Sequence, residues 1–125
     1  MKLLTERDAW AAAPIVISVS ETGLALSLEI ALRARGMETV IHDAKDGLLS
    51  LPLSINSTLI VDSEVLPHDA SGFLDRLRRE TWRGRLIILT EDIPNSVLTR
   101  LREDGAVLIE KPFGSAELIA EVERS

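Results

Sequence analysis

The sequence has no cysteine and no tyrosine, and its 125 residues include only two histidines, two tryptophans and two phenylalanines. Without cysteine the chain forms no disulfide, offers no thiolate to a metal ion and has no cysteine nucleophile. Two well-separated histidines do not predict a histidine-built metal centre. With so few aromatic side chains, the core is expected to consist of Leu, Ile, Val and Ala.

Long apolar runs and an excess of positive charge are also missing. The longest apolar runs, such as residues 86–89, have the length of a strand and not of a membrane span. Glu6, Arg7 and Asp8 interrupt the apolar stretch that a signal peptide needs. With 14 basic and 20 acidic side chains the net charge is −6, which argues against nucleic acid as a partner. We therefore predict a soluble cytoplasmic domain that contacts neither membrane nor nucleic acid.

Short apolar, β-branched runs alternate with helix-like segments from residue 14 onward. Nearly all these runs are continuously apolar, which is typical of strands covered on both faces; they comprise residues 15–19, 39–41, 58–61, 86–89 and 106–109. Helices are predicted over residues 22–35 and 73–80, from Asp92 and from Ser115, with a short helix or irregular turn within 44–53. This alternation predicts an α/β domain over residues 14–125, a doubly wound five-stranded parallel sheet. Residues 1–13 are predicted to be an N-terminal tail or a short extra helix.

The arginine-rich stretch after residue 75 is predicted to be mainly a solvated helix face, with contact to an acidic partner as the alternative. Its members are Arg76, Arg78, Arg79, Arg83 and Arg85.

Polar side chains follow four of the five predicted strands at the point where each strand ends. In an open parallel sheet, ligands bind beyond the carboxyl ends of the strands. Carboxylates, a hydroxyl and an ammonium gathered there predict a site for a metal-bridged phosphoryl group. The candidates are Ser20, Glu21 and Thr22 after the first strand, Asp62, Ser63 and Glu64 after the third, Thr90, Glu91 and Asp92 after the fourth, and Glu110, Lys111 and Pro112 after the fifth.

These segments, in this order and spacing, resemble the receiver domain of two-component response regulators over residues 14–124. The most specific segment is Lys-Pro-Phe after the fifth strand, which begins 21 residues beyond Thr90. The resemblance implies the flavodoxin-like (βα)5 fold. The other segments that carry it are Leu59-Ile60-Val61-Asp62 with Leu66-Pro67, Ile87-Ile88-Leu89-Thr90, Gly72-Phe73-Leu74 and Asp104-Gly105-Ala106.

What the resemblance implies about chemistry is a phosphoryl group moved from a sensor histidine kinase or phosphotransferase onto Asp62. Lys111 would pair with the acyl phosphate, and the Thr90 hydroxyl would bind it. Mg2+ would be held by Glu21, by Asp62 and by the backbone carbonyl of Glu64. Such a protein is not an enzyme beyond catalysing its own phosphorylation and dephosphorylation.

The resemblance also implies where partners bind, including a second copy in a homodimer. The expected face is formed by the fourth helix, the fifth strand and the fifth helix. Its expected apolar contributors are Ile93, Val97, Leu101 and Ile119, and the sequence leaves open which of them belong to the core.

Three features depart from the receiver pattern. Ser20 stands where the inner of two acidic residues would lie, which leaves Glu21 alone and lowers the expected Mg2+ affinity. Pro67 lies five residues past Asp62, one more than usual, so counting back from Pro67 gives Ser63 as the acceptor position. We favour Asp62, because the other register would bury it unpaired within the strand. Leu108 occupies the position of an aromatic residue whose ring rotates on activation.

Two functions therefore stay open. One is a stand-alone receiver that accepts a phosphoryl group on Asp62. The other is a pseudo-receiver that keeps the fold but acts as a phosphorylation-independent interaction or dimerisation module. A flavin carrier of the flavodoxin type is disfavoured, because no Gly-rich or Ser/Thr-rich phosphate loop follows the first strand and no aromatic side chain is available to stack on the flavin ring.

Overall fold

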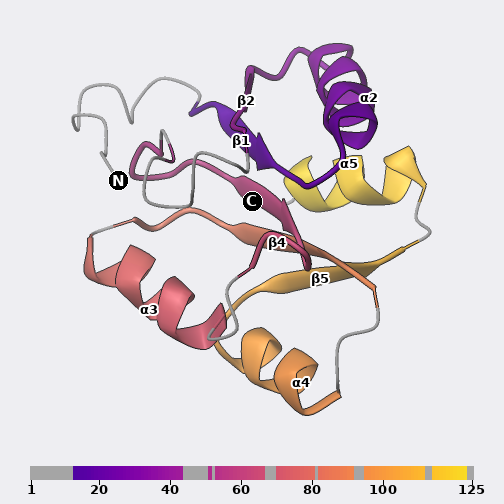
Figure 1. Cartoon of the computed structure of the whole chain (residues 1–125). Coiled ribbons are helices and arrows are strands. Elements are labelled where there is room, and N and C mark those ends of the chain that lie inside the picture. Colours follow the sequence, from indigo (N-terminus) through magenta and orange to yellow (C-terminus); the bar gives the residue numbers. More distant parts are fainter. Residues whose placement is uncertain are drawn as a thin grey trace.

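Five parallel strands form one sheet in the order β2-β1-β3-β4-β5 (Figure 1). The computed structural model describes residues 13–43, 51, 53–66, 70–80, 82–91, 95–111 and 114–123. The predicted doubly wound α/β fold is confirmed, because the strand order reverses between β1 and β3. The strands are β1 (Ile15–Ser18), β2 (Thr39–Ile41), β3 (Leu59–Asp62), β4 (Leu86–Thr90) and β5 (Val107–Glu110).

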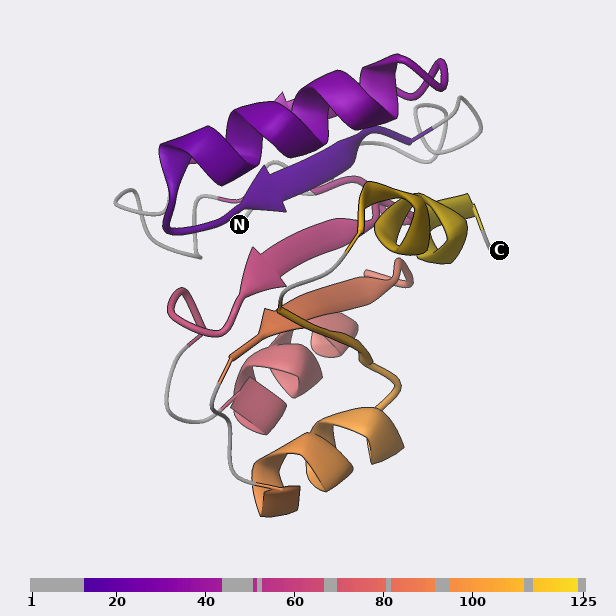
Figure 2. The ribbon, with the colours of Figure 1, turned by 90° about the vertical axis from the view of Figure 1, so that its right-hand side faces the viewer.

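Helices cover both faces of the sheet (Figure 2). One face carries α2 (Thr22–Arg33) and α5 (Ser115–Glu123), and the other carries α3 (Ala70–Arg79) and α4 (Asn95–Glu103). Helix α2 ends at Arg33, two residues before the predicted end at residue 35. The chain turns away from the helix at Gly36, whose φ of +82° is a conformation that glycine adopts without strain.

Alternate residues of the central strands enter two separate apolar clusters. Along β3, Leu59 and Val61 pack with α3 and α4, whereas Ile60 packs with α2 and α5. The same alternation holds along β4, where Ile87 and Ile88 face opposite clusters. Since side chains of a strand point alternately to the two faces, a strand covered on both sides has to be apolar throughout.

Several predicted features lie outside the described residues. These are the N-terminal segment 1–12, most of the short helix or irregular turn predicted within 44–53, Pro67, Asp92, Ile93, Pro112 and Phe113. Leu51 and Leu53 are described and are both fully buried. In the part of the chain that the structure describes, no helix has the length and apolar character needed to span a membrane.

Two residues of the expected partner face belong to the core. Leu101 of α4 and Ile119 of α5 are 1% and 7% exposed and belong to the two core clusters. Both lie on the inward stripe of their helices, and a side chain that packs against the sheet is not free to contact a partner. The side chain of Val97 lies outside the description, as does Ile93.

The arginine-rich stretch is mainly solvated, as predicted, since Arg76, Arg79 and Arg83 are exposed, but Arg78 is partly buried and has structural partners. The Arg78 guanidinium lies 4.7 Å from the centroid of the Trp82 ring and donates to the carbonyl oxygen of Gly84 at 2.8 Å. Burial, and then the charge of Arg83, lower the pKa of Arg78. Trp82 is fully buried in the core, so Arg78 tethers the end of α3 to the segment that leads into β4.

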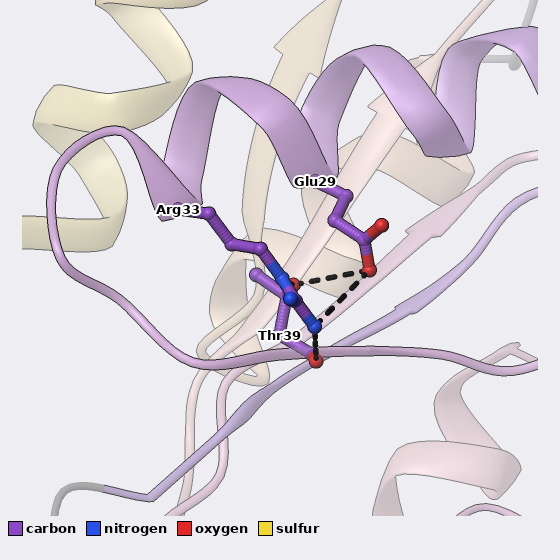
Figure 3. A network of polar contacts seen from close by, with 3 residues as sticks. All are labelled: Glu29, Arg33 and Thr39. Carbon is purple, nitrogen blue, oxygen red and sulfur yellow. Dashed lines mark hydrogen bonds and ion pairs between the residues drawn. The ribbon is translucent and has the colours of Figure 1, made fainter.

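A polar network joins α2 to the start of β2 (Figure 3). The Arg33 side chain donates from Nε to Thr39 Oγ1 at 2.9 Å and from Nη2 to the Thr39 carbonyl at 3.2 Å. Thr39 Oγ1 in turn donates to Glu29 Oε2 at 3.3 Å, and Glu29 pairs with Arg33 at 3.6 Å. The buried Thr39 hydroxyl therefore bonds to two side chains of α2 and holds this helix against the edge strand β2.

Thr39→Val is expected to lower the free energy of unfolding by about 1 kcal/mol, because the isosteric change removes the hydroxyl and leaves the Arg33 Nε donor without its acceptor. Urea unfolding followed by circular dichroism measures the change. Thr99→Val at an exposed position of α4 is the control and should be nearly neutral. Equal losses in the two variants would contradict a specific role for this network.

Candidate functional site

The Asp62 carboxylate lies at the carboxyl end of β3 and is 0% exposed. Its Oδ2 accepts hydrogen bonds from the backbone N–H of Ser20 at 2.9 Å and from the Ser20 hydroxyl at 2.6 Å. Its Oδ1 accepts from the backbone N–H of Val65 at 3.1 Å. Both carboxylate oxygens therefore have donors, as a buried ionised group requires.

Lys111 brings the positive charge to this site. Its Nζ lies 3.9 Å from Asp62 Oδ2, and its side chain is 19% exposed. The backbone N–H of Lys111 donates to the carbonyl of Thr90 at 2.9 Å, which continues the pairing of β4 with β5 and fixes where the side chain starts. Because β3, β4 and β5 are neighbours in the sheet, their carboxyl ends place Asp62 and Lys111 together, as the strand-end argument predicts.

Thr90 is the last residue of β4 and is 3% exposed. It lies in the strand between those of Asp62 and Lys111 and pairs in register with Glu110. Its hydroxyl therefore starts from the same sheet edge as the ion pair. Its role in binding a phosphoryl group stays a prediction.

The two predicted metal-binding glutamates are exposed. Glu21 is the N-cap residue of α2 and makes no side-chain capping hydrogen bond. Glu64 lies in the turn after β3, where the N–H of Val65 donates to the Asp62 carbonyl. Among the residues with described placement, no three His, Cys, Asp or Glu side chains are grouped to hold a metal ion.

The oxygen atoms near Asp62 are of the kind that Mg2+ prefers as ligands, but Ser20 competes for one of them. Mg2+ prefers hard oxygen ligands and commonly takes one or two carboxylates, and the carboxylates of Asp62 and Glu21 with the Glu64 carbonyl offer that chemistry. However, Ser20 already donates twice to Asp62 Oδ2. A cation at that oxygen would compete with the serine hydroxyl for it.

Ser20 is the functional residue whose role the sequence did not reveal. The sequence marked it only as a missing acid, whereas the structure makes it the closest described partner of Asp62. Its position directly after β1 could have indicated this contact. β1 and β3 are adjacent parallel strands, so their carboxyl ends lie side by side at the same edge of the sheet. Ser63, the alternative acceptor position, lies in the following turn, and Asp62 is the residue that contacts Lys111.

Leu108 and His42 have structural surroundings. Leu108, in the position of the expected aromatic, is half-buried and packs against the core cluster with α3 and α4. His42, just after β2, is buried with its Nδ1 2.9 Å from the hydroxyl of Ser18. Leu108 thus adds apolar packing near the end of β5 and brings no ring that could rotate.

Comparison with known proteins identifies the fold. The sequence matches no protein-family model and no curated protein. A CheY-like response-regulator receiver domain from Methanospirillum hungatei superposes with a TM-score of 0.70 at 17% identity, over 88% of this chain and 90% of that one. A response-regulator receiver protein from Pseudomonas putida gives 0.70 at 21% identity, over 92% and 99%. A Francisella response-regulator receiver domain gives 0.69 at 19% identity, over 88% and 93%. The chain therefore has the fold of receiver domains.

Proposed function

We propose that this protein is a receiver-type signalling domain in which Asp62 accepts a phosphoryl group from a histidine kinase or phosphotransferase. The observation that carries the proposal is the buried Asp62 carboxylate with Lys111 Nζ 3.9 Å from Oδ2 at the carboxyl edge of the sheet. A carboxylate beside an ammonium, at the ligand-binding edge of a doubly wound sheet, is suited to phosphoryl transfer.

The transfer is an in-line displacement at phosphorus. An Asp62 oxygen forms the new bond to phosphorus while the phosphorus–nitrogen bond of a phosphohistidine breaks, and the imidazole leaves with the electron pair. Lys111 offsets the negative charge of the resulting acyl phosphate, and the Thr90 hydroxyl donates a hydrogen bond to one of its oxygens. Mg2+ bound by Asp62, Glu21 and the Glu64 carbonyl would add neutralising charge. The protein acts on itself and needs no separate substrate site.

Phosphorylation would then alter protein–protein contacts. An acyl phosphate adds a charge of about −1.5 to −2 at a position that now holds one buried carboxylate. The Ser20 hydrogen bonds and the turn through Val65 surround that carboxylate, so both have to rearrange to admit the new group. The loops after β1 and β3 are thus the first segments to report the state to a partner.

A second function is favoured by a specific observation. Asp62 Oδ2 is already satisfied by Ser20, and Leu108 replaces the aromatic residue expected near the site. Both features suit a pseudo-receiver, in which the network is permanent and the domain binds partners or a second copy without phosphorylation.

The experiment is to incubate the protein with magnesium and acetyl phosphate and to measure its intact mass. We expect the mass to rise by one phosphoryl group in the wild type and not in Asp62→Asn, because the amide is a poor nucleophile. Amide chemical shifts on adding magnesium and beryllofluoride provide the second readout, with changes centred on the loops after β1 and β3. An unchanged mass together with unchanged shifts at millimolar magnesium would reject phosphoryl acceptance and leave the pseudo-receiver.

A further inference from the structure

Ser20 makes an unusual double contact with Asp62. Its backbone N–H and its hydroxyl both donate to the same carboxylate oxygen, Oδ2, at 2.9 and 2.6 Å. The same oxygen faces the Lys111 ammonium, so two hydrogen-bond donors and one cation converge on it, while Oδ1 has one described donor, the N–H of Val65. Hydrogen bonds to an ionised acceptor are shorter and stronger than neutral ones.

Ser20 also lies at the surface, whereas Asp62 does not. Asp62 is 0% exposed, and Ser20, whose hydroxyl donates to Oδ2, is exposed. A cation or phosphoryl group that approaches Oδ2 from solvent therefore competes with the serine hydroxyl for this oxygen.

There is room for that hydroxyl to move away. A cavity of about 260 Å3 adjoins Ser20 between the start of α2 and the end of β2. It is lined in part by Val19, Thr22, Ala25 and Ile41. Rotation of the Ser20 side chain out of contact with Asp62 thus needs no repacking of the two core clusters.

We infer that Ser20 is a latch on Asp62, a positioning residue whose hydroxyl competes with divalent cations for Oδ2 and so sets the cation affinity of the site. The inference builds on the proposed function, since it concerns access to the same carboxylate. In the closed state the Ser20 hydroxyl donates to Asp62 Oδ2, and the carboxylate has its hydrogen-bond donors without a metal ion. In the open state the hydroxyl has moved away, and Oδ2 is free to bind a cation while Lys111 stays beside it.

The test measures Mg2+ affinity by titrating the metal alone and following amide chemical shifts and the thermal unfolding midpoint. Removing the hydroxyl in Ser20→Ala is expected to raise the affinity about tenfold, the factor that corresponds to 1.4 kcal/mol and to the strength of a hydrogen bond to a charged group. Ser20→Thr keeps a hydroxyl and should retain the wild-type affinity. Ser27→Ala, at an exposed position of α2, should also leave it unchanged.

Asp62→Asn combined with Ser20→Ala locates the effect. This double variant should lose the gained affinity, because the carboxylate that receives the cation is gone. An affinity of Ser20→Ala within threefold of the wild type would overturn the latch, and so would a gain that persists in the double variant. A wild type that shows no measurable Mg2+ binding supports the latch if Ser20→Ala binds and overturns it if Ser20→Ala does not.

The latch and the proposed function can fail separately. Phosphoryl transfer to wild-type Asp62 with unchanged Mg2+ affinity in Ser20→Ala would retain the function and reject the latch. The expected gain in Mg2+ affinity without any phosphoryl uptake, in the wild type or in Ser20→Ala, would retain the latch and reject the function.

Discussion

Gly84→Ala is expected to lower the free energy of unfolding by about 3 kcal/mol or more, at the upper end of overpacking effects. A Cβ added at Gly84 would lie 1.7 Å from the carbonyl oxygen of Ser57 and 2.6 Å from Nε1 of Trp82. The first of these contacts is with backbone, which cannot turn aside as the end of a flexible side chain can. The alanine methyl group therefore forces apart the two segments that lead into β3 and β4.

The surrounding contacts raise the cost of that separation. Trp82 Nε1 donates to the Ser57 carbonyl at 2.9 Å, and the backbone N–H of Leu59 donates to the carbonyl of Arg85 at 2.8 Å. Arg78 donates to the Gly84 carbonyl itself. A shift at Gly84 thus disturbs a buried tryptophan, the first pairing of β3 with β4, and the tether from α3.

Urea unfolding followed by circular dichroism and by tryptophan fluorescence measures this effect. Gly23→Ala is the matched control, because a Cβ there meets nothing within 4 Å and Gly23 lies in the first turn of α2. Alanine in a helix is favoured over glycine by up to about 1 kcal/mol, so this control should be neutral or stabilising. A Gly84→Ala variant as stable as the wild type would show that the segments before β3 and β4 are not in such close contact.

Lys111→Met is expected to lower the free energy of unfolding by about 2 kcal/mol. The substitution keeps the apolar stem and removes the ammonium that faces Asp62, which leaves a fully buried carboxylate without its described cation. Removing one partner of a buried ion pair costs about 3–5 kcal/mol. The smaller value expected here follows from the 19% exposure of Lys111 and from the hydrogen bonds that Ser20 and Val65 still donate.

A double-mutant cycle with Asp62→Asn separates this charge effect from lost packing. In the Asp62→Asn background no buried carboxylate remains, so Lys111→Met should cost about 1 kcal/mol less or become neutral. Unfolding midpoints and slopes in urea for the wild type, both single variants and the double variant complete the cycle. Additive effects would contradict an energetic link between the two side chains.

The candidate site was predictable as far as strand ends could be located. Asp62, Thr90 and Lys111 each follow an apolar run, and parallel strands end at one edge, so their proximity follows from topology alone. The same reasoning predicted that Glu21 and Glu64 lie at this edge of the sheet. Both side chains are exposed, so the sequence predicted where their backbone lies but not where the side chains point. Direction and distance of a side chain depend on local turns, which spacing along the sequence does not specify.

Whether Leu101 and Ile119 belong to the core or to a partner face stayed open in the sequence for a similar reason. Helical periodicity shows which residues share a stripe, but it does not say whether the stripe faces the sheet or a partner. Burial of Leu101 and Ile119 at 1% and 7% settles that these two stripes complete the core. The sequence did not set Arg78 apart from its exposed neighbours, because the ring of Trp82 and the carbonyl of Gly84 reach it only in the folded chain.

By itself the sequence determined the strands, the helices, the parallel sheet and the edge at which polar groups gather. The strands follow from short, continuously apolar runs, the helices from the period of 3.6 residues, and the parallel sheet from the alternation of the two and the handedness of crossovers. Only the tertiary structure decided that Ser20, 42 residues away, caps Asp62 and that Gly84 lies against Ser57. Such contacts join segments that no local period relates, and tenths of an ångström in backbone placement decide whether a hydrogen bond or a clash results.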